Sequence, residues 1–321
     1  MPKFAVFYMF SDTTASMAMQ RLRRLRRINP NVVFIPVVGV PQFLFLPMVV
    51  DNYMFGSTTK LRGIGAVSHL ANMTALSAPG VFRLSHKINK ECGGFIRHNR
   101  LNDLGIRIEQ EGLPELHADF TPLVLWNLDH AIMNWFKTCG KRFDFDHLIF
   151  YEFDMFTTKP LKTIYGPYAN SYDACFFGYE KAAKNWRFYN FPPGASHATR
   201  KWLKQRMLPT TLYSSLFAGN MISRRVLEKL EGLGIDFSSG PPCQAEMRLP
   251  TVLSSIGFKC GSLSFSFFRY RPTISEEEIR SNEDAGIFHP VKTLTSYEQN
   301  PADHGNFPAA QNAQALDLPH L

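Results

Sequence analysis

Apolar and polar positions alternate in blocks over the first forty residues of the chain. FAVFYMF (residues 4–10) is a continuous apolar run, which is typical of a strand buried on both faces. The polar residues 11–14 supply capping side chains, and helical periodicity then predicts a helix over about 15–28. Asn29-Pro30-Asn31 closes this helix before a second apolar strand over 32–38. The order strand, helix, strand predicts a βαβ unit and therefore a parallel sheet.

The later pattern predicts the same class of fold. We expect helices over 123–140, over about 223–234 and up to residue 256, and strands over 147–156, 173–179 and 258–268. The predicted fold class is α/β, with a mostly parallel, Rossmann-like central sheet flanked by helices. Residues 1–292 are expected to form a single domain, with an insertion at about 41–120 that fits no clear period. Residues 293–321 are expected to form a loose C-terminal tail.

Composition and charge exclude some classes of protein and favour certain binding partners. The chain has 321 residues, of which 45% are hydrophobic and 19% charged, and this excludes a wholly disordered protein. It has 35 basic and 27 acidic residues, a net charge of +8, which favours anionic partners. Five arginines, at 21, 23, 24, 26 and 27, are expected on the solvent face of the first helix. No aromatic residue is interleaved with them, so we expect no specific nucleic-acid binding.

The cysteines and the hydropathy of the chain indicate the cellular compartment in which the protein is expected. The five cysteines are widely spaced and include no Cys-x-x-Cys pair, so reduced thiols and a cytoplasmic location are expected, with no signal peptide. The stretch Val32–Val50 is nearly long enough to span a bilayer, but its three prolines would interrupt a helix. A strand followed by an apolar loop is the preferred interpretation, and peripheral membrane contact through that loop is kept as an alternative.

The strongest chemical signal is YEFDMF, residues 151–156. In a strand, Glu152 and Asp154 would project from the same face, and two adjacent carboxylates become useful when a divalent cation lies between them and a diphosphate. This pair follows a buried strand, and open parallel sheets bind ligands beyond the carboxyl ends of their strands. A second pair, Asp144 and Asp146, precedes the strand and is interpreted as turn and capping residues.

The ordered set of features resembles the nucleotide-sugar-dependent glycosyltransferases of the GT-A fold. The resemblance rests on the first βαβ unit, the Glu152-Phe153-Asp154 triplet, SLFAGNMISRRVLEKL (215–230), AEMRLPTVLSSIGFK (245–259) and GIFHPVK (286–292). These segments cover about 3–40 and 120–292. The triplet departs from the family's usual Asp-x-Asp pattern, and residues 41–120 match no part of it.

The resemblance implies a role for each candidate residue. Glu152 and Asp154 would bind Mn²⁺ or Mg²⁺, and His289 would complete the metal site. Lys292 would contact the diphosphate of a nucleotide-diphosphate sugar as a point charge. The sugar donor would further contact the backbone at Gly219, the amide of Asn220 and, at its base or ribose, Asp12.

Glu246 is the predicted general base that takes a proton from the acceptor. Each of these residues also has an ordinary structural explanation, such as a cap or a strand turn. Two other functions stay open: a sugar nucleotidyltransferase, although SDTTASMAM (11–19) is not its Gly-rich phosphate loop, and a non-catalytic carbohydrate- or nucleic-acid-binding protein. The sugar, the acceptor and the stereochemistry are not specified by the sequence.

Overall fold

The computed structural model describes residues 2–11, 14–39, 98–114, 116–119, 127–186, 188–190, 194–235, 237, 241, 243–265, 267–269, 272–293 and 295–299. The strands are β1 (Phe4–Ser11), β2 (Val33–Gly39), β3 (His117–Asp119), β4 (His147–Glu152), β5 (Phe156–Thr157), β6 (Ala174–Lys181), β7 (Tyr213–Ser223), β8 (Cys260–Leu263), β9 (Phe267–Phe268) and β10 (Ile287–His289). The α-helices are α1 (Ala15–Ile28), α6 (His98–Gln110), α7 (Leu128–Thr138), α8 (Leu161–Ala169), α9 (Ala195–Gln205), α10 (Arg224–Gly232), α11 (Ala245–Ser255), α12 (Glu276–Arg280) and α13 (Ser296–Gln299). Two 3₁₀ turns, η4 (Gly140–Arg142) and η5 (Glu283–Ala285), complete the described elements.

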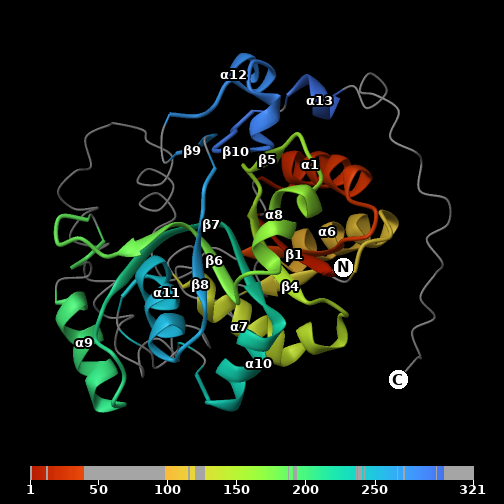
Figure 1. The fold of residues 1–321 in the computed structure, drawn as a ribbon. Helices are drawn as coiled ribbons and strands as arrows, with labels where there is room; N and C mark the ends of the chain where they lie inside the picture. Colours follow the sequence, from red (N-terminus) through yellow and green to blue (C-terminus); the bar gives the residue numbers. More distant parts are fainter. Residues whose placement is uncertain are drawn as a thin grey trace, which may run out of the picture.

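Seven of the strands form one central sheet in the order β3-β2-β1-β4-β7-β6-β8 (Figure 1). β1 pairs in parallel with β2 and β4, β2 with β3, and β6 with β8, whereas β7 runs antiparallel to both of its neighbours. The predicted α/β class with a mostly parallel sheet is therefore confirmed. The first predicted unit is also confirmed, because α1 spans residues 15–28 and connects the parallel strands β1 and β2.

Helices cover both faces of this sheet. Successive side chains of β1 point to opposite faces of the sheet. Ala5, Phe7 and Met9 belong to the core that α7, α10 and α11 cover. Their neighbours in β1 belong to the core that α1, α6 and α8 cover. Every residue of β1 from Phe4 to Phe10 is buried. The continuous apolar run of this strand thus reflects a sheet that is covered on both sides.

A second, three-stranded sheet lies beside the central one, in the order β5-β10-β9. β10 pairs antiparallel to β5 and parallel to β9, so it joins the chain just after β4 to a segment more than a hundred residues later. Its core contains Phe156, Ile274, Ile279, Phe288 and Val291. In Figure 1 this small sheet lies next to α1, with α12 and α13 above it.

Several expectations differ in detail from the structure. The helix expected over 123–140 is described as α7 over 128–138, and residues 120–126 lie outside the described ranges. Of the region expected to be an unplaced insertion, residues 98–110 form α6 and residues 117–119 form an edge strand of the central sheet. The beginning of the expected tail forms α13, in which Glu298 is buried.

The described residues also bear on the cysteines and on membrane insertion. Cys139, Cys175, Cys243 and Cys260 are free thiols, as expected, and Cys92 lies outside the described ranges. Among the helices that the structure describes, none has the length and apolar character needed to cross a bilayer. Of the apolar stretch 32–50, residues 33–39 form the buried strand β2, and the following residues are not among those described.

Candidate metal centre

The candidate site lies at the point where the strand order of the central sheet reverses. From β1 the chain continues to β2 and β3 on one side, whereas β4 pairs with the other side of β1. Met9 is paired with Glu152, so the carboxyl ends of β1 and β4 lie at the same edge of the sheet. In open α/β sheets such a switch point opens a crevice that binds ligands.

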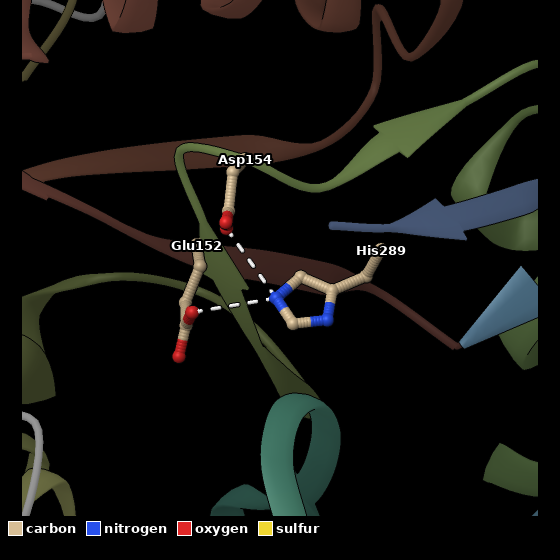
Figure 2. A group of neighbouring side chains, drawn as sticks. All are labelled: Glu152, Asp154 and His289. Atoms are coloured by element: carbon tan, nitrogen blue, oxygen red, sulfur yellow. Dashed lines mark ion pairs between the residues drawn. The ribbon is translucent and has the colours of Figure 1, made fainter. Parts of the chain in front are cut away.

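Three predicted ligands meet at this edge. Figure 2 shows the carboxylates of Glu152 and Asp154 directed toward the same edge of the His289 ring. His289 Nε2 lies 3.4 Å from Asp154 Oδ1 and 3.6 Å from Glu152 Oε2. Within the described part of the chain, they form the group of acidic, histidine and cysteine side chains close enough to hold a metal ion, with ligand atoms within 4.8 Å of one another.

The backbone brings the two carboxylates together in a way that differs from the prediction. β4 ends at Glu152, and residues 153 and 154 form a turn closed by a 3.0 Å hydrogen bond from Met155 N to Glu152 O. The expectation that both acids share one face of a continuous strand over 147–156 was therefore wrong. Phe153 N donates to Met9 O, which anchors the turn to the end of β1.

His289 reaches the carboxylates from the small sheet. It is the last residue of β10, and its backbone carbonyl accepts a 2.9 Å hydrogen bond from Arg269 N. Two residues later, Val291 N donates to Asp154 O at 2.7 Å, so the histidine segment is bonded to the turn that contains Asp154. The ring of Phe268 lies 5.1 Å from the His289 ring, centroid to centroid, and supports it from the side.

Electrostatics couple the three side chains. Burial would lower the pKa of His289, but Asp154 and Glu152 outweigh it and raise the pKa to about 10. Burial would raise the pKa of Asp154, and His289, Arg21 and Lys292 together lower it instead. The free site therefore contains an imidazolium next to the ionised carboxylate of Asp154 at neutral pH. At 3.4 Å, the contact with Asp154 is longer than a usual hydrogen bond and is mainly electrostatic.

This set of donors fits a divalent cation. Asp154 Oδ1 is buried and, among the described residues, accepts no hydrogen bond; the electrostatic contact with His289 compensates its charge in the free site, and a bound cation would take that place. Two carboxylates and one imidazole are compatible with Mn²⁺, and carboxylates with Mg²⁺. The opposite ring nitrogen, Nδ1, is buried and lacks a partner in the described ranges, so the carboxylates contact the ring through Nε2 alone.

Comparison of the sequence with known proteins identifies no relative. No protein-family model matches the chain, and no curated protein matches it significantly. The candidate function therefore rests on the site itself and on the ordered motifs of the sequence.

Lys292, the predicted diphosphate ligand, lies close enough to Asp154 for its charge to act on that carboxyl group. It follows Val291, and its positive charge contributes to the low pKa of Asp154. Its backbone N–H donates to Thr273 Oγ1 at 3.1 Å, which holds this part of the chain against the loop before α12. Contact of this lysine with a diphosphate stays a prediction.

Gly219 and Asn220 lie inside β7 rather than in an open turn. Gly219 has a φ of +76°, and a Cβ there would lie 2.9 Å from the Phe268 ring and 3.3 Å from the Tyr165 hydroxyl. Packing and backbone conformation therefore explain this glycine without a sugar. Asn220 is 3% exposed and accepts a hydrogen bond from Phe177 N. Direct contact of either residue with a donor stays a prediction.

Glu246 occupies the first turn of α11, as predicted, and is half-buried. Its backbone carbonyl accepts a hydrogen bond from Ser215 Oγ near the start of β7. Because β7 runs antiparallel to β4, its first residues lie toward the edge where β4 ends, which is the edge of the metal centre. Asp12, predicted to contact the nucleotide, lies outside the described residues; its neighbour Ser11 ends β1 at the same edge.

The structure assigns a different place to one arginine of the first helix. Arg21 is 2% exposed, and it points into the protein instead of lying on a solvent face. The expectation for this residue was wrong because it lies on the same side of α1 as the buried Ala18 and Leu25, at spacings of three and four residues. That helical spacing is the signal in the sequence that could have identified it.

Proposed function

We propose that the protein is a metal-dependent glycosyltransferase that transfers a sugar from a nucleotide-diphosphate sugar to an acceptor. The observation that supports this most is the meeting of Glu152, Asp154 and His289 beyond the carboxyl end of β4, at the strand-order switch. A divalent ion bound there would neutralise the charge that develops on a leaving nucleoside diphosphate. The motif order described above, which resembles that of GT-A enzymes, supports the same class of reaction.

Different residues of the chain would perform the different steps of such a reaction. Glu152, Asp154 and His289 would hold the ion, and Lys292 would hold the diphosphate by its charge. Glu246, at the start of α11, would take the proton of the acceptor hydroxyl in an inverting transfer. The positive end of the helix dipole favours an ionised carboxylate at this position. Asp236, an alternative base, lies outside the described residues.

Calorimetric titration with UDP and GDP, each with and without Mn²⁺, tests the proposal. We expect one nucleotide to bind with Mn²⁺ and weakly or not at all without it. Asp154→Asn should abolish the metal-dependent part, because it removes the charge of a buried ligand while keeping its shape. The matched control is Asp144→Asn, which changes the exposed Asp-x-Asp pair at the amino end of β4, where Asp144 pairs with Lys3.

The outcomes separate the alternatives that the sequence left open. Metal-independent binding, or equal binding by Asp154→Asn and the parent, would contradict the metal site. If the protein instead consumes a nucleoside triphosphate and a sugar phosphate and releases pyrophosphate, it is a nucleotidyltransferase. If neither nucleotide nor metal binds, a non-catalytic binding protein becomes the better explanation.

A further inference from the structure

Arg21 of α1 makes more hydrogen bonds than an arginine on the surface of a helix needs. Guanidinium has five N–H donors, and all five are used. Nε donates to Glu298 Oε1, Nη1 donates to the carbonyls of Phe153 and Val291 at 2.8 Å each, and Nη2 donates to the Thr293 carbonyl at 3.0 Å and to Glu298 Oε2 at 3.3 Å. A buried cation with every donor satisfied imposes a defined geometry on its partners.

The partners of Arg21 are the segments that contain the candidate ligands. Phe153 is the residue between Glu152 and Asp154, and Val291 follows His289 by two positions. Thr293 is adjacent to Lys292. One guanidinium therefore connects the turn of the two carboxylates with the segment of the histidine and the lysine. These segments meet only in the folded chain, because more than 130 residues separate them in sequence.

Glu298 completes the connection from the C-terminal side. It lies 277 residues from Arg21 in sequence, and its side chain is fully buried in α13. Its Oε2 also accepts hydrogen bonds from the backbone N–H and the hydroxyl of Thr295, at 2.8 and 3.1 Å. Burial opposes the charge of Arg21, but the Glu298 carboxylate outweighs it, and the pKa of Arg21 is raised.

We propose that Arg21, held by Glu298, is a positioning residue of the metal centre, which keeps the Asp154 turn and the His289–Lys292 segment in the arrangement that lets their side chains face one another. This inference rests on the proposed metal site and extends it to a residue that touches neither metal nor substrate. Outer partners of metal ligands typically change metal affinity by about 10–100-fold when they are replaced. Lysine cannot substitute, because it has three donors around a point charge instead of five in a fixed plane.

The chain offers a closely matched control. Arg248 is also buried, at 4% exposure, and it also uses its guanidinium fully, with bonds to Asp129, to Asn127 and to the carbonyls of Pro241 and Cys243. None of these partners belongs to the segments that contain the ligands. Arg248→Lys thus removes a comparable buried network elsewhere in the fold, and it reports how far loss of global stability alone affects metal binding.

The experiment measures Mn²⁺ affinity by calorimetry for the full chain, Arg21→Lys and Arg248→Lys, together with their thermal transitions. We expect both variants to unfold at lower temperature, and Arg21→Lys alone to lose about 10–100-fold in Mn²⁺ affinity. Hydrogen exchange in the metal-free proteins should rise over 153–158 and 287–293 only in Arg21→Lys. If Arg21→Lys does not fold, Glu298→Gln replaces it, with an expected loss of about tenfold.

Three results would overturn the inference, and they are distinguishable. Unchanged Mn²⁺ affinity in Arg21→Lys, or an equal loss in Arg248→Lys, would show that Arg21 contributes stability without positioning the ligands. Failure of the parent chain to bind Mn²⁺ would overturn the proposed metal function itself, and the positioning role with it.

Discussion

Binding of Mn²⁺ to the metal-free protein at pH 8 should displace close to one proton from the His289 ring. A histidine must be neutral to coordinate a metal, so a ring that is protonated in the free protein releases its proton when the ion binds. The structure places Nε2 of this ring next to two carboxylates, which raise the pKa of His289 to about 10 despite its burial. The metal and the proton therefore compete for the same position.

The pKa sets the size of the effect. At pH 8, a group with a pKa of about 10 is roughly 99% protonated, whereas a histidine at the ordinary value of about 6.5 would be roughly 3% protonated. Asp154 adds no proton in this range, because its pKa is lowered and its carboxylate is already ionised. We therefore expect release of about one proton, and a rise in apparent Mn²⁺ affinity of about tenfold per pH unit between 7 and 9.

Calorimetry in two buffers with different ionisation enthalpies measures the number of protons released. The slope of the observed heat against buffer enthalpy should be near one for the parent at pH 8. In His289→Gln, which removes the titrating group, the slope should fall to near zero and the remaining affinity should depend little on pH. A slope near zero in the parent, with binding that still requires Asp154, would refute the argument, because His289 would then be neutral or would not bind the ion.

Three further predictions concern catalysis and stability. Glu246→Gln should lower turnover by about 10²–10⁴-fold while nucleotide affinity is retained, and steady-state kinetics within a few-fold of the parent would exclude it as the base. Gly219→Ala should lower the free energy of unfolding by about 1–3 kcal/mol, because φ is +76° and a Cβ would press on Phe268; Gly166→Ala in α8, where the space is open, should not. The pKa of His289 is raised in the folded protein, so the protonated ring stabilises the fold fully below its unfolded pKa of about 6.5, and this contribution is lost as pH rises through about 10. The free energies of unfolding of the metal-free parent and of His289→Gln, measured with denaturant, should therefore converge over that pH range.

The parts of the fold that could be predicted are those that local pattern determines. A seven-residue apolar run can be buried on both faces only inside a covered sheet, and Asn29-Pro30 ends the helix that follows it. Glu152 and Asp154 could be identified because acidic residues directly after a buried strand lie at the ligand-binding edge of a parallel sheet. His289 was identified through the resemblance, since nothing in its local sequence distinguishes it from a structural histidine.

The parts that could not be predicted depend on contacts between distant segments. The turn after Glu152 forms where the chain leaves the central sheet to pair as β5 with β10, and no local pattern specifies that pairing. Gly219 is explained by Phe268, which belongs to another sheet. Arg21 lies on the apolar side of its helix, but only the arrival of Glu298 makes its burial favourable.

The arginines of α1 also change what the net charge implies. The excess of basic residues favoured an anionic partner, and the densest run lies in this helix. Arg21 and Arg23 pair with Glu298 and Glu111, and Arg24 donates to the Thr157 carbonyl and lies 4.4 Å from the centre of the Phe156 ring. Arg21 and Arg24 thus hold the C-terminal segment and the small sheet to the helix, and Arg23 pairs with the residue that follows α6. A charge for binding the proposed diphosphate is therefore better sought in Lys292, whose charge acts on Asp154, than in the arginine run of α1.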